Sequence, residues 1–184
     1  MPRTIEELCE RCRRGDAEAA SELLAQHYER IFAYFRRLCG NEADASDLTQ
    51  KAFCKVWQSI QTYEGKAQFT TWLHGIAHHV YVDWRRIKNR FESASDEWWL
   101  TCASEGPSPF EQTADRETAH QLYALVEELE EATRETVHLH YYQGLTIQET
   151  ADALGIATST VKYRLRGAVD FMKSKLLKAD RQQV

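Results

Sequence analysis

The chain has 184 residues, which at about 150 residues per domain allows one or two domains and excludes a large multidomain enzyme. Hydrophobic residues make up 43% and charged residues 28%, an ordinary balance for a globular protein that excludes wholesale disorder and collagen-like structure. No apolar run is long enough to cross a bilayer, and residues 1–8 lack the apolar core of a signal peptide, so we expect a cytoplasmic protein without membrane insertion.

The residue types favour helices. Alanine and leucine together number 37 against 15 for valine and isoleucine, and no proline occurs between Pro2 and Pro107. Asn-Gly or Asp-Gly turns between alternating runs, which would signal hairpins, are missing from the sequence. The five cysteines are an odd number in a chain without an export signal, which indicates mostly reduced thiols. The sequence therefore predicts an all-α fold.

Three amphipathic helices are predicted in residues 1–90, each from one apolar stripe at helical spacing. The first ends near Cys39 and Gly40, and its expected core stripe is Leu24, Tyr28, Ile31, Phe35 and Leu38. The second spans about 43–60, with apolar residues Leu48, Phe53, Val56, Trp57 and Ile60. The third follows a break at 64–66, and its stripe is Phe69, Leu73, Ile76, Val80, Trp84 and Ile87. We expect these helices to form a bundle.

The third helix carries a second stripe that is not apolar. Trp72, His79, Asp83 and Arg86 share one face, and aromatic rings at Tyr63 and Phe69 lie beside Lys66 and Gln68 on its approach. One interpretation is a solvated face whose cations complement the helix dipole. The other is a surface that stacks unpaired bases, since rings interleaved with cations suit that task.

Net charge is −5 and unevenly distributed: residues 93–135 carry −9, whereas residues 66–90 carry +4 and residues 160–184 carry +5. The acidic stretch also holds the densest cluster of Ser, Gly and Pro, so we place a flexible linker at residues 91–117. Within it, the adjacent Trp98 and Trp99 are expected to dock on a neighbouring surface. The two basic stretches are local patches suited to phosphate, despite the acidic pI.

The second predicted domain, residues 118–184, opens with a helix over 118–142 that Gly144 ends; its core candidates are Leu122, Leu125, Leu129 and Val137. A two-turn helix over 147–154, a turn at Gly155 and a longer basic helix then follow, which is the pattern of a helix-turn-helix. Residues that could reach bases and phosphates opposite its apolar stripe are Thr158, Ser159, Lys162 and Arg166. A helical hairpin packed on itself would have the same spacing.

Two groups of motifs resemble the sigma-70 family of bacterial RNA polymerase initiation factors, in its small extracytoplasmic-function class. The first group resembles region 2 and reads DASDLTQKAF at 44–53, VW at 56–57, FTTWLHGIA at 69–77 and DWRR at 83–86. The second resembles region 4 and reads YQGLTIQETA at 142–151, LGI at 154–156 and TVKYRL at 160–165. Either group alone would be suggestive, and both in this order are specific.

The resemblance implies two small helical domains, a region 2 bundle and a region 4 helix-turn-helix, in a promoter-specificity subunit without catalysis or cofactor. Its partners would be core RNA polymerase, promoter DNA and an anti-sigma factor that covers the polymerase-binding faces. It would direct transcription of stress- or signal-responsive genes. By resemblance, the helix that binds core polymerase presents Asp47, Leu48, Gln50, Phe53 and Trp57. The melted minus-ten element would meet Tyr63, Lys66, Gln68, Phe69, Trp72 and His79, with its backbone on Arg85 and Arg86. The minus-thirty-five duplex would be read by Thr158, Ser159, Thr160, Lys162, Tyr163, Arg164 and Arg166.

Some positions depart from the family pattern. Ser46 and Lys51 stand where that pattern usually has acids, which predicts a core affinity that is weak or regulated. His79 replaces the usual asparagine, which would alter the minus-ten preference. Ala157 occupies the usual serine cap, so we expect Thr158 to cap the recognition helix. Gly167 and Val169 replace frequent arginines, which would weaken duplex binding and flatten its salt dependence.

Parts of the sequence are also compatible with two other functions. An autonomous helix-turn-helix regulator would bind duplex DNA as a dimer, but no dimerisation heptad is evident. A metal-dependent hydrolase could use His74 and His78 with His79 and Asp83, but no glutamate base lies between the first two histidines. The pair Cys9 and Cys12 lacks the second pair of a zinc site.

Overall fold

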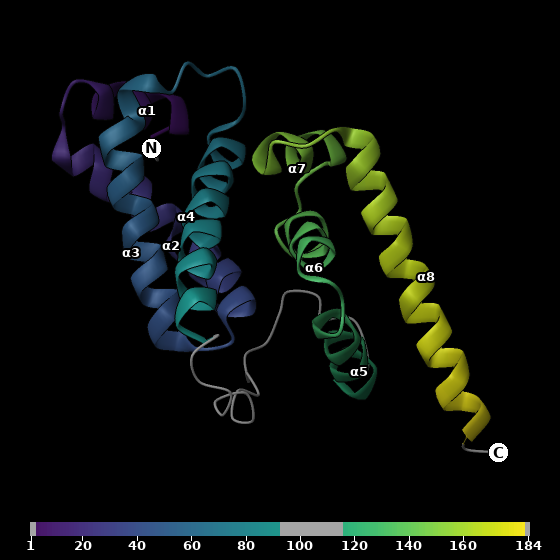
Figure 1. The fold of residues 1–184 in the computed structure, drawn as a ribbon. Helices are drawn as coiled ribbons and strands as arrows, with labels where there is room; N and C mark the ends of the chain where they lie inside the picture. The colour runs from purple at the N-terminus through teal and green to yellow at the C-terminus, as the bar shows by residue number, and fades with distance from the viewer. Residues whose placement is uncertain (1–2, 93–115, 183–184) are drawn as a thin grey trace. The chain divides into compact units, whose positions relative to one another are not determined.

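A computed structural model describes residues 3–92 and 116–182 of the chain, and every regular element in these two ranges is helical. The described residues form two compact units, the first from the residues before position 93 and the second from those after position 115 (Figure 1). The first holds α1 (Ile5–Arg13), α2 (Ala17–Cys39), α3 (Glu42–Ser59), the short 3₁₀ turn η1 (Ile60–Thr62) and α4 (Phe69–Glu92). The second holds α5 (Arg116–Glu127), α6 (Glu131–Val137), the π-helical turn η3 (His138–Tyr142), α7 (Ile147–Leu154) and α8 (Thr158–Gln182). The predicted all-α class is confirmed.

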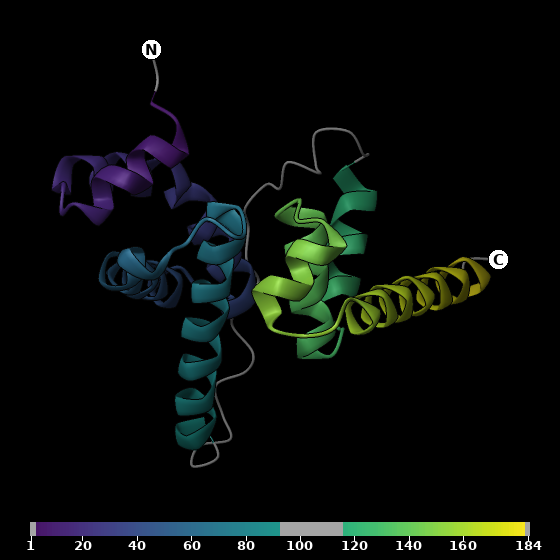
Figure 2. The same cartoon turned by 90° about the horizontal axis from the view of Figure 1, so that it is seen from above.

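In the first unit, α3 packs against both α2 and α4, and α1 packs on α2 (Figure 2). The turn between α2 and α3 follows from its residues. Gly40 takes the left-handed conformation (φ 75°) that ends α2, and the Asn41 side chain accepts the Asp44 N–H at 2.8 Å to begin α3. The three helices predicted from periodicity are therefore present, while α1 was not predicted.

Three members of the predicted stripes lie outside the core of the first unit, among them Trp57 of α3, which is 42% exposed. Ile31 and Phe35 of α2 are fully buried, but Tyr28 in the same stripe is 41% exposed. Ile87 of α4 is 53% exposed, although the adjacent Lys88 pairs with Asp44 of α3 at 3.4 Å, so this turn of α4 contacts α3 while Ile87 faces solvent. An apolar stripe alone does not show which of its members face solvent.

The second unit surrounds a small core formed by Val126, Leu129, Val137, Ala151, Val161, Leu165 and Ala168. The single helix predicted over 118–142 is wrong, since the chain turns at residues 128–130 between α5 and α6. The Glu130 carboxylate causes this break by accepting the Ala132 and Thr133 N–H groups, which starts a new helix. The turn also buries Leu129.

Most of the predicted linker, including Trp98 and Trp99, lies outside the described residues. Where the structure does describe its ends, α4 continues to Glu92 and α5 begins at Arg116. Among the described helices, none combines the length and the apolar character that a membrane span requires.

Candidate protein and nucleic-acid interfaces

The exposed side of α3 carries most of the residues predicted to bind polymerase. Asp47 and Gln50 are exposed, Trp57 is 42% exposed and Phe53 is half-buried. Leu48 is the exception, because it is fully buried in the bundle and offers no surface to a partner. Its prediction as a contact residue is contradicted by this geometry: its position in the motif reflects helix packing.

The apolar part of this surface extends onto α2. Tyr28 stacks nearly parallel on Phe32, with ring centroids 6.0 Å apart, and lies 6.1 Å from Phe53 on α3. With Trp57 these residues form what we call the aromatic face (Tyr28, Phe32, Phe53 and Trp57). Tyr28 was placed in the apolar stripe of α2 and was therefore missed as a surface residue. Phe32 was assigned no role.

Three aromatic side chains gather where the loop of residues 63–68 meets α4. The Tyr63 ring lies 5.1 Å from Trp72 and 5.7 Å from Phe69, and Phe69 lies 5.8 Å from Trp72. Tyr63 and Trp72 are half-buried and therefore present part of each ring to solvent. Phe69 is only 3% exposed and packs on His27 at 5.2 Å. The structure thus corrects the prediction that Phe69 faces DNA: it supports the other two rings from beneath.

The polar residues of this loop are accessible. Lys66 and Gln68 are exposed, and Lys66 pairs with the neighbouring Glu64. The Tyr63 hydroxyl donates to the Ala67 carbonyl at 2.8 Å, which closes the loop on itself. Burial, together with the nearby Cys9 and Glu6 of α1, raises the pKa of Tyr63, so its hydroxyl stays protonated.

Farther along α4, the predicted polar face is present. His79 and Arg86 are exposed, and Asp83 between them is half-buried. The Asp83 carboxylate accepts from Arg86 at 3.2 Å and lies 3.5 Å from the Lys55 ammonium of α3. Arg85 is half-buried. Asp83 is therefore held by cations on either side, and a phosphate at Arg86 would compete with it.

The helix-turn-helix is formed by α7 and α8. Thr146 and Glu149 make a reciprocal capping box at the start of α7, and Gly155 ends it in the left-handed conformation (φ 64°). The Ala157 carbonyl accepts from Val161 at 3.2 Å and α8 begins at Thr158. Ala157 is thus the cap position, which corrects the expectation that Thr158 caps the helix.

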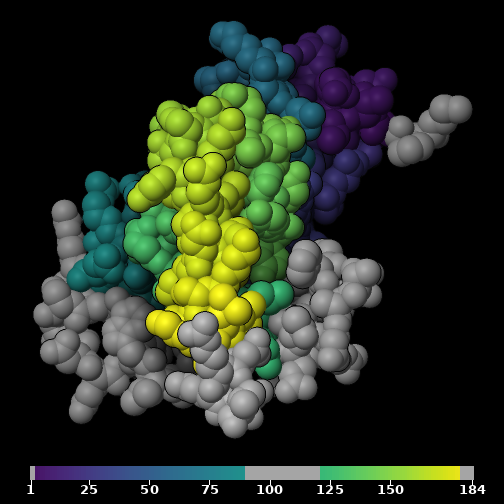
Figure 3. All heavy atoms as spheres, turned by 90° about the vertical axis from the view of Figure 1, so that its right-hand side faces the viewer, coloured from purple at the N-terminus to yellow at the C-terminus, as the bar shows by residue number. Residues whose placement is uncertain are grey.

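Most residues of the predicted recognition set lie at the surface of α8, which faces the viewer in Figure 3. Ser159, Lys162 and Arg166 are exposed, and Tyr163 is 78% exposed. Thr158 and Thr160 are half-buried. Arg164 differs, since its Nη1 donates to the Ala132 carbonyl and the Thr136 hydroxyl of α6, both at 3.4 Å. Arg164 therefore joins α8 to α6, and its prediction as a DNA contact is not supported by this orientation.

The residues weighed for metal binding lie in packed positions. Cys9 and Cys12 are buried on α1, and burial raises the pKa of Cys9 to about 11, which disfavours the thiolate that binds metal. His74 is fully buried, with Nδ1 2.7 Å from the Thr70 carbonyl. Within residues 3–92 and 116–182, no three His, Cys, Asp or Glu side chains are grouped to hold a metal ion.

Comparison with known families decides between these functions. Residues 23–91 match the family described as Sigma-70 region 2, and residues 119–172 match the family described as Sigma-70, region 4. The chain belongs to the sigma-70 family. The resemblance read from the two motif groups is confirmed, and this sigma factor directs promoter recognition by RNA polymerase and transcription initiation as a non-catalytic subunit.

Individual relatives place the sigma factor in the extracytoplasmic-function (ECF) class. It is 32% identical over 158 residues to the ECF RNA polymerase sigma factor SigE of Mycolicibacterium smegmatis, which covers 85% of this chain and 61% of that protein. It is 29% identical over 150 residues to ECF SigX of Bacillus subtilis (79% of this chain, 77% of that protein). ECF SigW of the same species is 23% identical over 184 residues (96% and 98%).

Two solved structures share the fold. CnrH in complex with the cytosolic domain of CnrY matches with a TM-score of 0.68 and 22% identity, covering 94% of this chain and 96% of that one. The sigma factor RpoE in complex with the anti-sigma factor NepR from Bartonella quintana matches with a TM-score of 0.71 and 22% identity, covering 87% and 97%.

Proposed function

We propose that the first unit of this sigma factor docks on core RNA polymerase and holds the melted minus-ten DNA, while the second unit reads the minus-thirty-five duplex. The domains would be residues 1–90 and 118–184, joined by the acidic linker 91–117. The observation that carries the proposal is that the accessible members of each predicted set gather on one surface. The accessible members on α3, and those on the 63–68 loop with α4, belong to the first unit, and those on α8 belong to the second.

The docking surface on α3 combines charge and aromatic area. Asp47 and Gln50 offer polar contacts beside the aromatic face, and large rings are the side chains that most often dominate interface energies. Lys51, also exposed, adds a positive charge where the family pattern usually has an acid. We therefore expect a core affinity below that of a sigma factor with the usual charges at this position.

The minus-ten surface suits unpaired bases. Extruding a base from a duplex costs a few kcal/mol, and stacking a base on an aromatic ring returns about 1–3 kcal/mol. Tyr63 and Trp72 are held by ring contacts before DNA arrives, so little ordering remains to oppose binding. Lys66, Gln68 and His79 then supply donors around the rings, and Arg85 and Arg86 the charge for the backbone.

The second unit presents α8 for the major groove. Ser159, Lys162, Tyr163 and Arg166 extend from the exposed side of its first half, where a recognition helix contacts base edges. The capping box of α7 and the Gly155 turn fix how α7 leads into α8. This geometry supports duplex reading by a preformed helix.

We further propose a cytoplasmic location and control by an anti-sigma protein, in response to stress or another signal. The aromatic face would be exposed in the absence of polymerase, which gives an inhibitor a surface to cover. The complex of RpoE with the anti-sigma factor NepR supports the analogy. Such an inhibitor should compete with core polymerase, so purified inhibitor that binds this sigma factor together with core would contradict the proposal.

The test of the proposed function is run-off transcription with purified core polymerase on a genomic promoter library, with and without this protein. Specific transcripts should appear only when it is added, and their start sites should share both promoter elements. Gln50→Ala should weaken transcription at limiting core concentration, whereas Val82→Ala, an equally simple change at an exposed position of α4, should not. Tight duplex binding by the free protein, with no effect on core, would overturn the proposal in favour of an autonomous regulator.

A further inference from the structure

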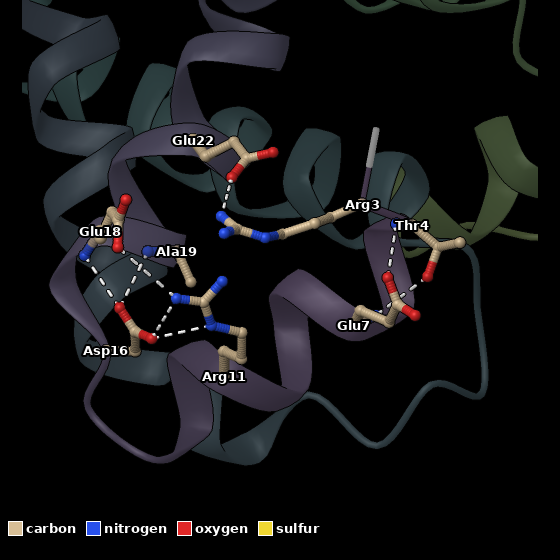
Figure 4. A network of polar contacts seen from close by, with 8 residues as sticks. All are labelled: Arg3, Thr4, Glu7, Arg11, Asp16, Glu18, Ala19 and Glu22. Atoms are coloured by element: carbon tan, nitrogen blue, oxygen red, sulfur yellow. Dashed lines mark hydrogen bonds and ion pairs between the residues drawn. The ribbon is translucent and has the colours of Figure 1, made fainter. Parts of the chain in front are cut away.

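Helix α1 lies outside the part of the chain that matches the family, which begins at residue 23. It is nevertheless firmly attached to α2, as Figure 4 shows. The Arg3 guanidinium pairs with Glu22 at 2.7 Å, and the Arg11 guanidinium pairs at 2.6 Å with Asp16, the residue that caps α2. A capping box of Thr4 and Glu7 fixes the start of α1.

The inner side of α1 adds apolar contact to these ion pairs. Leu8, Cys9 and Cys12 are at most 3% exposed. Exposed ion pairs alone would contribute little, but a buried leucine and two buried thiols hold the helix against the bundle. Consequently α1 is a fixed support rather than a loose N-terminal arm.

From this support, Arg13 reaches the loop that carries the minus-ten residues. Its Nη2 donates to the Tyr63 carbonyl at 2.9 Å, and its guanidinium carbon lies 5.9 Å from the centroid of the Tyr63 ring. Its Nη1 is held in turn by Glu10 at 2.7 Å. The Arg13 side chain, fifty residues earlier in the chain, thus contacts both the backbone and the ring of Tyr63.

Tyr63 passes this constraint to the rest of the loop. Its hydroxyl is bonded to the Ala67 carbonyl and its ring contacts Trp72. A displaced Tyr63 would therefore move the segment that holds Lys66 and Gln68, and would leave Trp72 with only the Phe69 ring of its two ring contacts. The bond from Arg13 to the Tyr63 carbonyl is the polar contact, among the described residues, that ties α1 to this loop.

We propose that Arg13 is a positioning residue for promoter reading: it holds Tyr63 and the 63–68 loop in the geometry that selects an unpaired minus-ten base. The proposal rests on the proposed function of that loop. Arg13 does not touch DNA in this scheme, and it acts on base preference through Tyr63.

The experiment uses holoenzyme assembled from core polymerase and the full chain, and the probe is a bubble template with a randomised single strand of about ten nucleotides. Bound strands are sequenced to obtain the enrichment of the preferred base at each position. Arg13→Ala should lower the strongest enrichment about fivefold or more, because a charged hydrogen bond is lost. Arg13→Lys, which keeps a cation near the ring but not the planar fork, should recover part of it.

Arg14→Ala is the matched control. Arg14 is the neighbouring arginine, it pairs with the same Glu10, and it is exposed with no bond to the loop that the structure records. It should enrich the same bases as wild type to the same extent. A thermal melt of the free protein shows whether Arg13→Ala folds. If it does not, the base enrichment of Arg13→Lys is compared with that of Arg14→Ala instead.

Each outcome has one meaning. Wild-type enrichment with a loss confined to the Arg13 variants supports the proposal. Wild-type enrichment that all variants retain overturns it and leaves the proposed function intact. If the wild-type holoenzyme selects no base at all, the minus-ten function of the loop itself is wrong, and the positioning role is overturned along with it.

Discussion

Substitutions at Leu48 and Gln50 distinguish the buried side of α3, which stabilises the bundle, from its exposed side, which we propose binds core polymerase. Leu48 is fully buried, so Leu48→Ala removes its contacts and leaves a cavity, at a cost of about 3–5 kcal/mol. That is a large fraction of the roughly 5–15 kcal/mol that stabilises a typical domain. Gln50→Ala changes an exposed side chain and should alter stability by less than about 0.5 kcal/mol. Affinity for core polymerase, measured on the folded proteins, should instead fall more in Gln50→Ala than in Leu48→Ala.

The assay pairs urea denaturation with core binding. Trp57, Trp72 and Trp84 lie in helices of the first unit and residues 116–184 contain no tryptophan, so tryptophan fluorescence reports the unfolding of the first unit. Binding is measured by competition with wild type for core polymerase. This assay contains no urea and is run at a temperature at which Leu48→Ala is still folded. Leu48→Met, which conserves volume, should cost less than about 1.5 kcal/mol. Wild-type stability of Leu48→Ala together with weakened core binding would refute the reasoning, since Leu48 would then be a contact residue.

Three further predictions concern other parts of the molecule. Lys162→Ala should reduce the slope of log affinity against log salt for duplex DNA by about 1, whereas Arg164→Ala should change that slope less and instead lower stability by about 1 kcal/mol in denaturation. Gly155→Ala places a side chain in the left-handed region and should destabilise the second unit by about 1–2 kcal/mol, visible in the unfolding transition followed by circular dichroism. Burial lowers the pKa of His27 below its usual 6.5, so the unfolded state binds the proton more readily than the folded state. The first unit should therefore lose stability as the pH falls through 6.5, which thermal melts at several pH values would measure. In His27→Leu this part of the pH dependence should be absent.

Periodicity and turn residues predicted much of this fold because both are local. The end of α2 at Gly40 and the start of α7 at Thr146 depend on residues within one helical turn, and both were predicted correctly. The break between α5 and α6 was missed, since its signal is a glutamate serving as a cap, a role more often taken by Ser, Thr, Asp or Asn. The nine-residue α1 was missed, although Thr4 and Glu7 form the same capping box that begins the eight-residue α7.

The candidate sites were harder to predict, because a motif marks positions and not directions. Leu48 and Phe69 lie inside the motifs of the family, yet both are buried. Tyr28 was expected in the core and is 41% exposed, although its ring lies 6.1 Å from Phe53 of α3. Which side of a helix meets a partner depends on how neighbouring helices cross it, and that information is distributed over the whole bundle.

Both proposed DNA surfaces consist of residues that contact DNA and residues that hold them. In the second unit Arg164 joins α8 to α6. In the first unit Phe69 supports Trp72 of α4, and Arg13 holds Tyr63 of the 63–68 loop. A contact residue that neutralises phosphate changes the salt slope of binding when it is removed. A supporting residue leaves the number of phosphate contacts unchanged and acts through geometry, so its loss should weaken selection between bases with little change in that slope. Salt dependence therefore distinguishes the two kinds of residue where position in the motif does not.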